Sequence, residues 1–147
     1  MSEIHRIKCG NVNCYIIENG TNGILVDTGK AEFLDKVIEA SRLYRVKLII
    51  LTHAHFDHAE NAAKIADELG IPIGMHEKDC NLISSNAKQS LSAVNILGKI
   101  VLAASLKEFS VRPMPAFQPD LFLHDHDSLS DYGIDARIIS LPGHTDG

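Results

Sequence analysis

The first third of the chain alternates between hydrophobic patterns typical of strands and of helices. Residues Val12–Glu18 are rich in β-branched and aromatic side chains, which predicts a strand. Turn-forming residues fill positions 19–23, and the apolar segment 24–27 predicts a second strand that completes a hairpin. From residue 31 to residue 39 the apolar positions repeat at helical spacing, so we expect a helix there.

A strand with almost no polar residue follows this helix. Positions 46–51 are apolar apart from Lys47, which is typical of a strand buried on both faces of a sheet. Helical spacing returns at 62–69, Gly70 occupies the position of a C-terminal cap, and residues 71–75 are extended again. This alternation of strands and helices indicates an α/β fold.

The second half of the chain has a less regular pattern. Residues 84–106 predict a helix that is apolar on more than one face and has to be covered by this domain or by a partner, so we expect a homo-oligomer as one way of covering it. Three prolines at positions 113–119 mark an irregular connector. Residues 121–123 and 136–141 predict two strands around a turn region rich in Asp and Ser.

Length and composition predict one globular domain that covers residues 1–147. Hydrophobic residues make up 45% of the chain and charged residues 22%, as in ordinary globular proteins. The net charge of -5 and the lack of a cluster of Lys and Arg argue against nucleic acid as a partner. We therefore expect a small-molecule substrate.

Cysteine usage and the N-terminus indicate a cytoplasmic protein. Cys9, Cys14 and Cys80 are an odd, sparse set without a Cys-x-x-Cys pair, which favours reduced thiols over a disulfide framework. The N-terminus lacks the pattern of a signal peptide. The longest apolar-rich stretch, residues 93–106, is interrupted by polar residues and too short to span a bilayer, so we expect no membrane association.

Four side chains able to bind a metal occur within six residues, directly after the strand predicted at 46–51. They are His53, His55, Asp57 and His58. In an extended chain alternate side chains point the same way, so His53, His55 and Asp57 can converge while His58 points elsewhere. The alternative is a polar loop whose histidines only bond to the backbone, but four such groups at this spacing favour a metal site with positions for two ions.

With these residues the sequence resembles the metallo-β-lactamase-fold superfamily, and in particular hydrolases like glyoxalase II. The family motif His-x-His-x-Asp-His is complete at residues 53–58. The segments Leu-Val-Asp-Thr-Gly at 25–29 and Leu-Pro-Gly-His-Thr at 141–145 are similar to two further motifs of the family, in the same order. The resemblance implies the N-terminal part of an αββα sandwich with an incomplete second half, truncated at the C-terminus.

The resemblance also implies a ligand set. His53, His55 and His144 would surround one metal ion, while Asp57 and His58 would contribute to a second. The expected cofactor is zinc, as one or two ions, although the same ligands accept iron or manganese. Asp27 would brace the histidine motif from behind, and its alternative is an ordinary turn or capping aspartate.

The function implied is hydrolysis of a thioester, ester, lactone or lactam by a zinc-bound hydroxide, with Asp57 orienting the nucleophile and accepting its proton. The acidic charge disfavours nuclease activity, and His55 disfavours the flavodiiron branch, while an iron-dependent persulfide dioxygenase stays open. Members of the family continue beyond Gly147 with a bridging aspartate and a last histidine. The alternative is therefore a catalytically incompetent fragment that binds at most one metal, or a chain active only in an oligomer or with a complementary chain.

Two other groups of polar residues compete as sites. The segment His-Asp-His-Asp at 124–127 is a tempting second cluster, but its place in a turn between strands favours an exposed hairpin. His76 and Glu77 follow a strand and read equally well as its solvated end, so we assign them no role.

Overall fold

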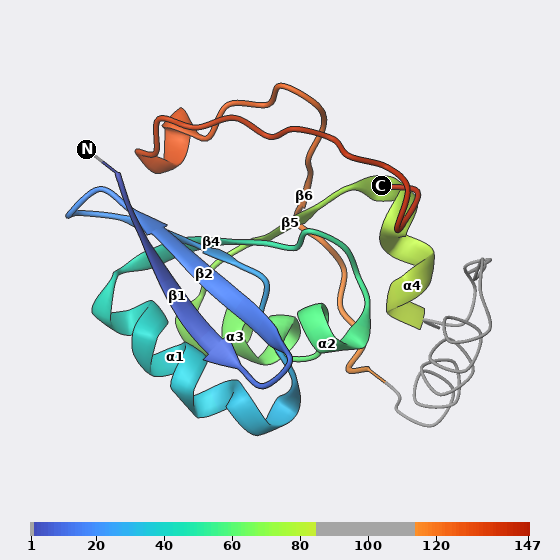
Figure 1. Ribbon diagram of the computed structural model, residues 1–147, viewed down its shortest axis with the longest axis horizontal. Helices are drawn as coiled ribbons and strands as arrows, with labels where there is room; N and C mark the ends of the chain where they lie inside the picture. The colour runs from blue at the N-terminus through green and yellow to red at the C-terminus, as the bar shows by residue number, and fades with distance from the viewer. Residues whose placement is uncertain (1, 85–113) are drawn as a thin grey trace.

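One mixed sheet forms the centre of the computed structural model, which describes residues 2–84 and 114–147 (Figure 1). Within these residues the strand order is β1-β2-β3-β4-β5-β6. The strands are β1 (Glu3–Cys9), β2 (Val12–Glu18), β3 (Gly23–Val26), β4 (Val46–Ile50), β5 (Ile73–Met75) and β6 (Leu121–Phe122). The first three pair antiparallel, and from β3 onward each strand is parallel to the next.

Short helices connect the parallel strands. The α-helices are α1 (Leu34–Leu43), α2 (Phe56–Ala59), α3 (Ala62–Leu69) and α4 (Cys80–Ser84), and the 3-10 turns are η1 (Ala31–Phe33), η2 (Glu77–Asp79) and η4 (Ser130–Tyr132). Beyond Ser84, the helix predicted over residues 84–106 lies outside the described residues, as does Pro113. In the part of the chain that is described, no helix has the length and hydropathy needed to cross a bilayer.

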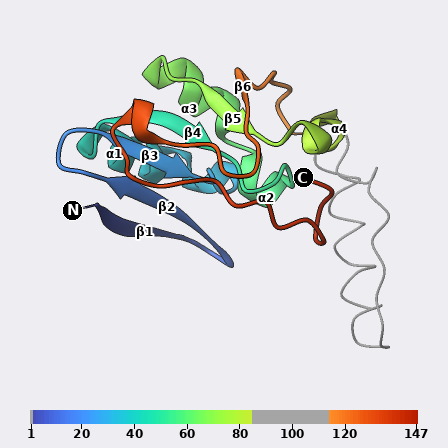
Figure 2. The ribbon, with the colours of Figure 1, turned by 90° about the horizontal axis from the view of Figure 1, so that it is seen from above.

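The sheet is covered on both faces. Helices α1 and α3 lie on one face, where Val37 and Ile65 pack with Leu25 and Ile49 (Figures 1 and 2). The C-terminal segment crosses the opposite face, where Leu129 and Ile134 pack with a second set of strand residues, namely Ile24, Leu48 and Ile50. Consecutive residues of β3 and β4 therefore belong to different cores, as the alternation of side chains along a strand requires.

Most elements predicted in the first half of the chain are confirmed. The strand predicted at 46–51 is buried on both faces, and Lys47 is its one exposed residue. Gly70 caps α3 in the left-handed conformation with a φ of 64°. The sequence did not predict strand β1, because the polar Arg6 and Lys8 obscure its hydrophobic pattern. The strand forms through its antiparallel pairing with β2.

The strand predicted at 136–141 is wrong. Only an isolated bridge between Ser128 and Arg137 forms there. The amide of Ser140 donates to the side chain of Asp125 at 3.0 Å instead of to a neighbouring strand. Ile138 packs against the second core, but Ile139 is 69% exposed and Leu141 81% exposed, so the rest of the segment lacks the burial that would hold it as a strand.

Candidate metal centre

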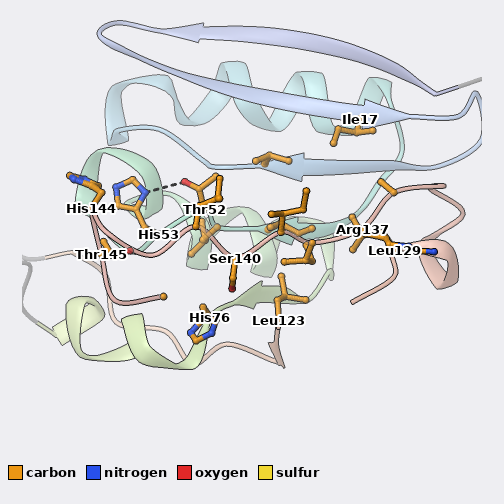
Figure 3. A pocket seen from close by; sticks show the side chains of 18 residues that line it. Ile17, Thr52, His53, His76, Leu123, Leu129, Arg137, Ser140, His144 and Thr145 are labelled. Atoms are coloured by element: carbon orange, nitrogen blue, oxygen red, sulfur yellow. Dashed lines mark hydrogen bonds between the residues drawn. The ribbon is translucent and has the colours of Figure 1, made fainter. Parts of the chain in front are cut away.

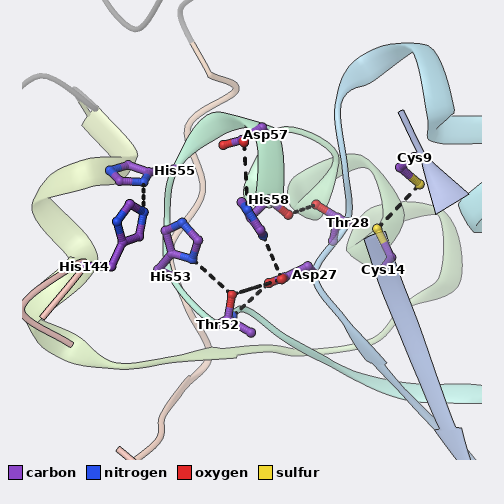
Figure 4. Close-up of polar contacts among 10 residues, drawn as sticks. All are labelled: Cys9, Cys14, Asp27, Thr28, Thr52, His53, His55, Asp57, His58 and His144. Atoms are coloured by element: carbon purple, nitrogen blue, oxygen red, sulfur yellow. Dashed lines mark hydrogen bonds and ion pairs between the residues drawn. The ribbon is translucent and has the colours of Figure 1, made fainter. Parts of the chain in front are cut away.

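The site lies at the carboxyl ends of three neighbouring strands. The histidine loop, residues 52–58, follows β4, and Asp27 follows β3, which is parallel to β4. His76 and Asp79 follow β5, on the other side of β4. The histidine turn, residues 142–147, brings His144 to the same edge from the far end of the chain (Figure 4). In open α/β sheets this edge is where ligands bind.

Three of the predicted ligands converge there. His53, His55 and His144 each offer a ligand atom, and these atoms lie within 4.8 Å of one another. Nδ1 of His55 is 3.2 Å from Nε2 of His144. The ring of His53 stands nearly perpendicular to the other two, at 87° and 81°. The structure thus joins two segments that lie far apart in the sequence around one point.

This donor set fits a divalent metal ion. Oγ1 of Thr52 lies 3.0 Å from Nδ1 of His53, which leaves Nε2 of that ring for a ligand. Imidazoles bound to tetrahedral zinc at about 2.1 Å place their nitrogens roughly 3.4 Å apart. The 3.2 Å between the nitrogens of His55 and His144 is close to that spacing. Three imidazoles with room for a fourth ligand are a donor set of catalytic zinc sites.

Burial prepares these imidazoles for a metal. It is the largest cause that lowers the pKa of His53, to about 3, and the charges of the neighbouring histidines act in the same direction. Burial also lowers the pKa of His55, as does the charge of His144, while the charges of Asp57 and Asp79 oppose the shift. Because a metal binds the neutral imidazole, a lowered pKa reduces competition from protons.

Asp27 braces the histidine loop from behind. Its Oδ1 accepts hydrogen bonds from the amide of Thr52 at 2.8 Å and from the Thr52 hydroxyl at 3.0 Å. Its Oδ2 lies 2.8 Å from Nδ1 of His58. Asp27 is 5% exposed and has a φ of 61°, so its backbone turns directly after β3. These contacts support the bracing role and not the role of an ordinary capping aspartate.

The other two predicted ligands lie on the first turn of α2. Asp57 and His58 are helical, so the extended chain expected through the whole motif ends at His55. Oδ2 of Asp57 lies 3.8 Å from Nε2 of His58, and the rings of His53 and His58 have centroids 4.2 Å apart. Asp57 therefore points toward His58 and not into the cluster of three histidines.

His58 differs from the other imidazoles in its charge environment. Burial alone lowers the pKa of His58, but the hydrogen bond and the charge of Asp27, with the charge of Asp57, outweigh burial and raise it. In the neutral ring the 2.8 Å contact with Asp27 favours the proton on Nδ1, which leaves Nε2 available on the side of Asp57. A carboxylate behind a ligand imidazole orients the ring in this way.

Sequence reasoning missed two residues that hold the site together. Asn61 is fully buried, and its Nδ2 donates to the carbonyl oxygens of Thr28 and Lys30 at 3.0 and 2.7 Å. The hydroxyl of Thr28 in turn donates to the carbonyl oxygen of His58 at 2.8 Å. These bonds tie the loop after β3 to the C-terminal end of α2. Nothing in the sequence pattern distinguishes Asn61 from a surface asparagine.

The competing cluster at 124–127 is an exposed hairpin, as expected. His126 has a φ of 69°, and the amide of His124 donates to Oδ2 of Asp127 at 2.7 Å, which closes the turn. His124, Asp125 and His126 are exposed, and the ring of His124 lies 6.0 Å from that of His76. His76, to which we assigned no role, packs beside Gly147 of the histidine turn.

A groove of about 420 Å³ opens beside the histidines, between the sheet and the C-terminal segment (Figure 3). His53, Thr52 and His144 lie at one end of it. Apolar side chains from several strands line the rest, including Ile17 and Leu123. The groove therefore joins the cluster of histidines to the second face of the sheet.

Comparison with known proteins agrees with this geometry. A family model described as the metallo-beta-lactamase superfamily matches residues 7–147. The chain belongs to the metallo-beta-lactamase superfamily. Among solved structures, BJP-1 from Bradyrhizobium japonicum, a subclass B3 metallo-beta-lactamase, superposes with a TM-score of 0.67 at 22% identity, over 92% of this chain and 48% of that one. A metallo-beta-lactamase from Cronobacter sakazakii gives 0.72 at 17% identity, over 98% and 52%.

Two sequence relatives match along most of this chain. Hydroxyacylglutathione hydrolase GloC of Haemophilus influenzae is 31% identical over 149 residues, which is 99% of this chain and 62% of the relative. A protein of Mycobacterium bovis is 28% identical over 139 residues, 92% of this chain and 57% of its own length. The chain thus spans about three fifths of these curated relatives and about half of the superfamily structures named above, which agrees with the expected partial αββα sandwich.

Proposed function

We propose that this chain is the metal-binding part of a zinc-dependent hydrolase. The observation that carries the proposal is the meeting of His53, His55 and His144, whose ligand atoms lie within 4.8 Å of one another. A zinc ion in such a site lowers the pKa of water toward neutrality and polarises a carbonyl oxygen. Iron or manganese is the alternative metal, because imidazole binds all three.

The substrate class we propose first is a thioester. The relative from Haemophilus influenzae is named a hydroxyacylglutathione hydrolase, and acyl derivatives of glutathione are thioesters. Esters, lactones and lactams follow, since their carbonyl groups present the same chemistry to a nucleophile. The net charge of -5 keeps nucleic acid outside the proposal.

The residues around the histidines take distinct roles. Asp57 is our proposed catalytic residue, because its partly buried carboxylate lies on the first turn of α2, beside the histidine loop and 3.8 Å from Nε2 of His58. It accepts the proton of the attacking water. Asp27 and Thr52 orient the imidazoles. Oδ2 of Asp27 lies 2.8 Å from Nδ1 of His58, and Oγ1 of Thr52 lies 3.0 Å from Nδ1 of His53. His58 and Asp57 are also the proposed ligands of a second ion.

The first test is turnover of a glutathione thioester by purified protein loaded with zinc. We expect hydrolysis that is abolished in His53→Ala and falls at least 100-fold in kcat in Asp57→Asn, since a general base contributes on the order of 10² to 10⁴. The matched control is His126→Ala, an exposed histidine outside the cluster, which should keep wild-type activity. Equal turnover by wild type and His53→Ala would reject the proposal.

A second candidate is a metal-binding chain that becomes active only when another copy or a complementary chain completes it. One reason is the second metal position, because its two proposed protein ligands, Asp57 and His58, leave it incomplete. Another reason is the exposure of Ile139 and Leu141 near His144. Exposed apolar surface of this kind favours association. Turnover per chain that rises with protein concentration, together with a dimer in light scattering, would separate this candidate from the first.

We also propose a cytoplasmic location. Cys9, Cys14 and Cys80 are free thiols. Sγ of Cys14 donates a hydrogen bond to Sγ of Cys9 at 3.7 Å, and no disulfide joins this buried pair (Figure 4). Thiols this close persist in a reducing compartment. Fractionation of cells that express the tagged protein tests the location.

A further inference from the structure

Asp79 is a buried carboxylate outside the ligand set and the Asp27 network. It ends η2 and is 2% exposed. Its Oδ1 accepts a hydrogen bond from the amide of Gly147 at 3.0 Å. Its Oδ2 is also buried and has no hydrogen bond from the described residues. A buried carboxylate is costly, so its presence at this place calls for a physical reason.

The contact between Asp79 and Gly147 leaves no room for a side chain. A Cβ atom on Gly147 would lie 2.9 Å from Cγ of Asp79 and 2.9 Å from Cβ of His76. Both distances are shorter than Cβ contacts in real proteins. The backbone of the histidine turn therefore lies directly against η2 and its cap residue His76, and glycine permits this approach.

The contact between Asp79 and Gly147 also affects the position of His144, which lies three residues before Gly147. Within the turn the amide of Gly143 donates to the carbonyl oxygen of Thr145 at 2.9 Å, and Thr145 is 5% exposed. This internal bond closes the part of the turn that carries His144. His144 itself is exposed and its ring contacts those of His53 and His55, so its position depends on where the turn is held.

We propose that Asp79 is a positioning residue that fixes the histidine turn on η2 and thereby sets His144 in place for the metal. This inference rests on the proposed metal site and adds to it a residue that the family resemblance did not supply. Asp79 does not touch the metal in this arrangement. It acts through the amide of Gly147, and groups outside the ligand set that orient a ligand commonly change metal affinity 10- to 100-fold.

The test is zinc affinity, measured by competition with a chromophoric chelator, in Asp79→Ala and Asp79→Asn of the full chain. We expect Asp79→Ala to bind zinc roughly 10- to 100-fold more weakly than wild type. Asp79→Asn keeps an oxygen that accepts the Gly147 amide, so it should recover most of the affinity. Gly147→Ala should weaken binding like Asp79→Ala, because the new Cβ forces the same two elements apart.

The matched control is Asp120→Ala. Oδ2 of Asp120 accepts the amide of Ile73 at 2.8 Å, the same kind of bond at the opposite end of the parallel strands. If Asp79→Ala lowers the melting temperature while its zinc affinity stays at the wild-type value, Asp79 is merely structural and the inference is overturned. Equal losses of affinity in the two alanine variants would overturn it as well.

A second readout is independent of the metal. In metal-free protein, amide hydrogen exchange at residues 143–147 should become faster in Asp79→Ala and stay unchanged in Asp120→Ala. If wild type binds no zinc, the proposed function fails, and the exchange rates still decide whether Asp79 holds the turn. Unchanged exchange in Asp79→Ala contradicts the inference whatever the metal result.

Discussion

At the scale of single residues, Asp27 connects the fold to the chemistry. Its carboxylate accepts hydrogen bonds from Thr52 and faces Nδ1 of His58, so one buried group orients two parts of the histidine loop. Asp27→Asn isolates the charge, because asparagine also tolerates the φ of 61°. We predict that the pKa of His58 falls in this variant, measured by NMR titration of metal-free protein.

The exposed Asp131 provides the control for that titration. Asp131→Asn should leave the titration of His58 unchanged. A His58 that titrates in Asp27→Asn as it does in wild type would show that the ion pair at 2.8 Å has no effect on the charge of the ring.

His53 makes the stability of the metal-free protein depend on pH. Its pKa is about 3 in the folded protein against 6.5 as the ordinary value, so below pH 6.5 the unfolded chain binds a proton that the folded protein does not. The free energy of unfolding therefore decreases as the pH falls from 6.5 toward 3. We predict a weaker decrease in His53→Asn, measured by urea unfolding across this range. The exposed His126→Asn should keep the wild-type slope, and an unaltered slope in His53→Asn would contradict the prediction.

At the scale of elements, the loop after β3 is packed against the β1–β2 hairpin. Gly29 has a φ of 69°, and a Cβ there would lie 3.2 Å from Cβ of Cys9 and 3.4 Å from Sγ of Cys14. Gly70 has nearly the same φ, 64°, with nothing within 4 Å. Gly29→Ala should therefore destabilise the protein by about 1–3 kcal/mol more than Gly70→Ala, because crowding adds to the shared backbone strain. Denaturant unfolding of both variants measures the difference, and equal losses would contradict it.

The elements also show what a sequence pattern can and cannot predict. The apolar run of β4 and the cap at Gly70 are local signals, and both are confirmed. Helix α2 has four residues, and its position depends on bonds from Thr28 to His58, which no periodicity reports. The segment 136–141 has the composition of a strand, but among the described residues it forms only the isolated bridge between Ser128 and Arg137.

Much of the site was predictable because its signal is also local. His53, His55, Asp57 and His58 are adjacent in the sequence, so their spacing alone indicates a metal site. Asp79 carries no such signal. It becomes visible only when the histidine turn lies against η2, which is a long-range contact of the folded chain.

At the scale of the whole molecule, the three-histidine cluster joins parts of the chain that are 89 positions apart. A metal that needs both parts binds the folded state more tightly than the unfolded chain, so it stabilises the fold. At a zinc concentration 1,000 times the dissociation constant the gain is about 4 kcal/mol. We predict a higher melting temperature with zinc than with a chelator, and no such difference in His144→Ala. A zinc-induced shift that persists in His144→Ala would place the metal elsewhere.

The most direct test asks whether these imidazoles share one ion. Titration with zinc measures stoichiometry and affinity in wild type and in the single variants His53→Ala, His55→Ala and His144→Ala. Each variant should lose the tight site, and His124→Ala, an exposed histidine outside the cluster, should keep it. Loss in the two loop variants with undiminished affinity in His144→Ala would show that the histidine turn takes no part in binding the metal.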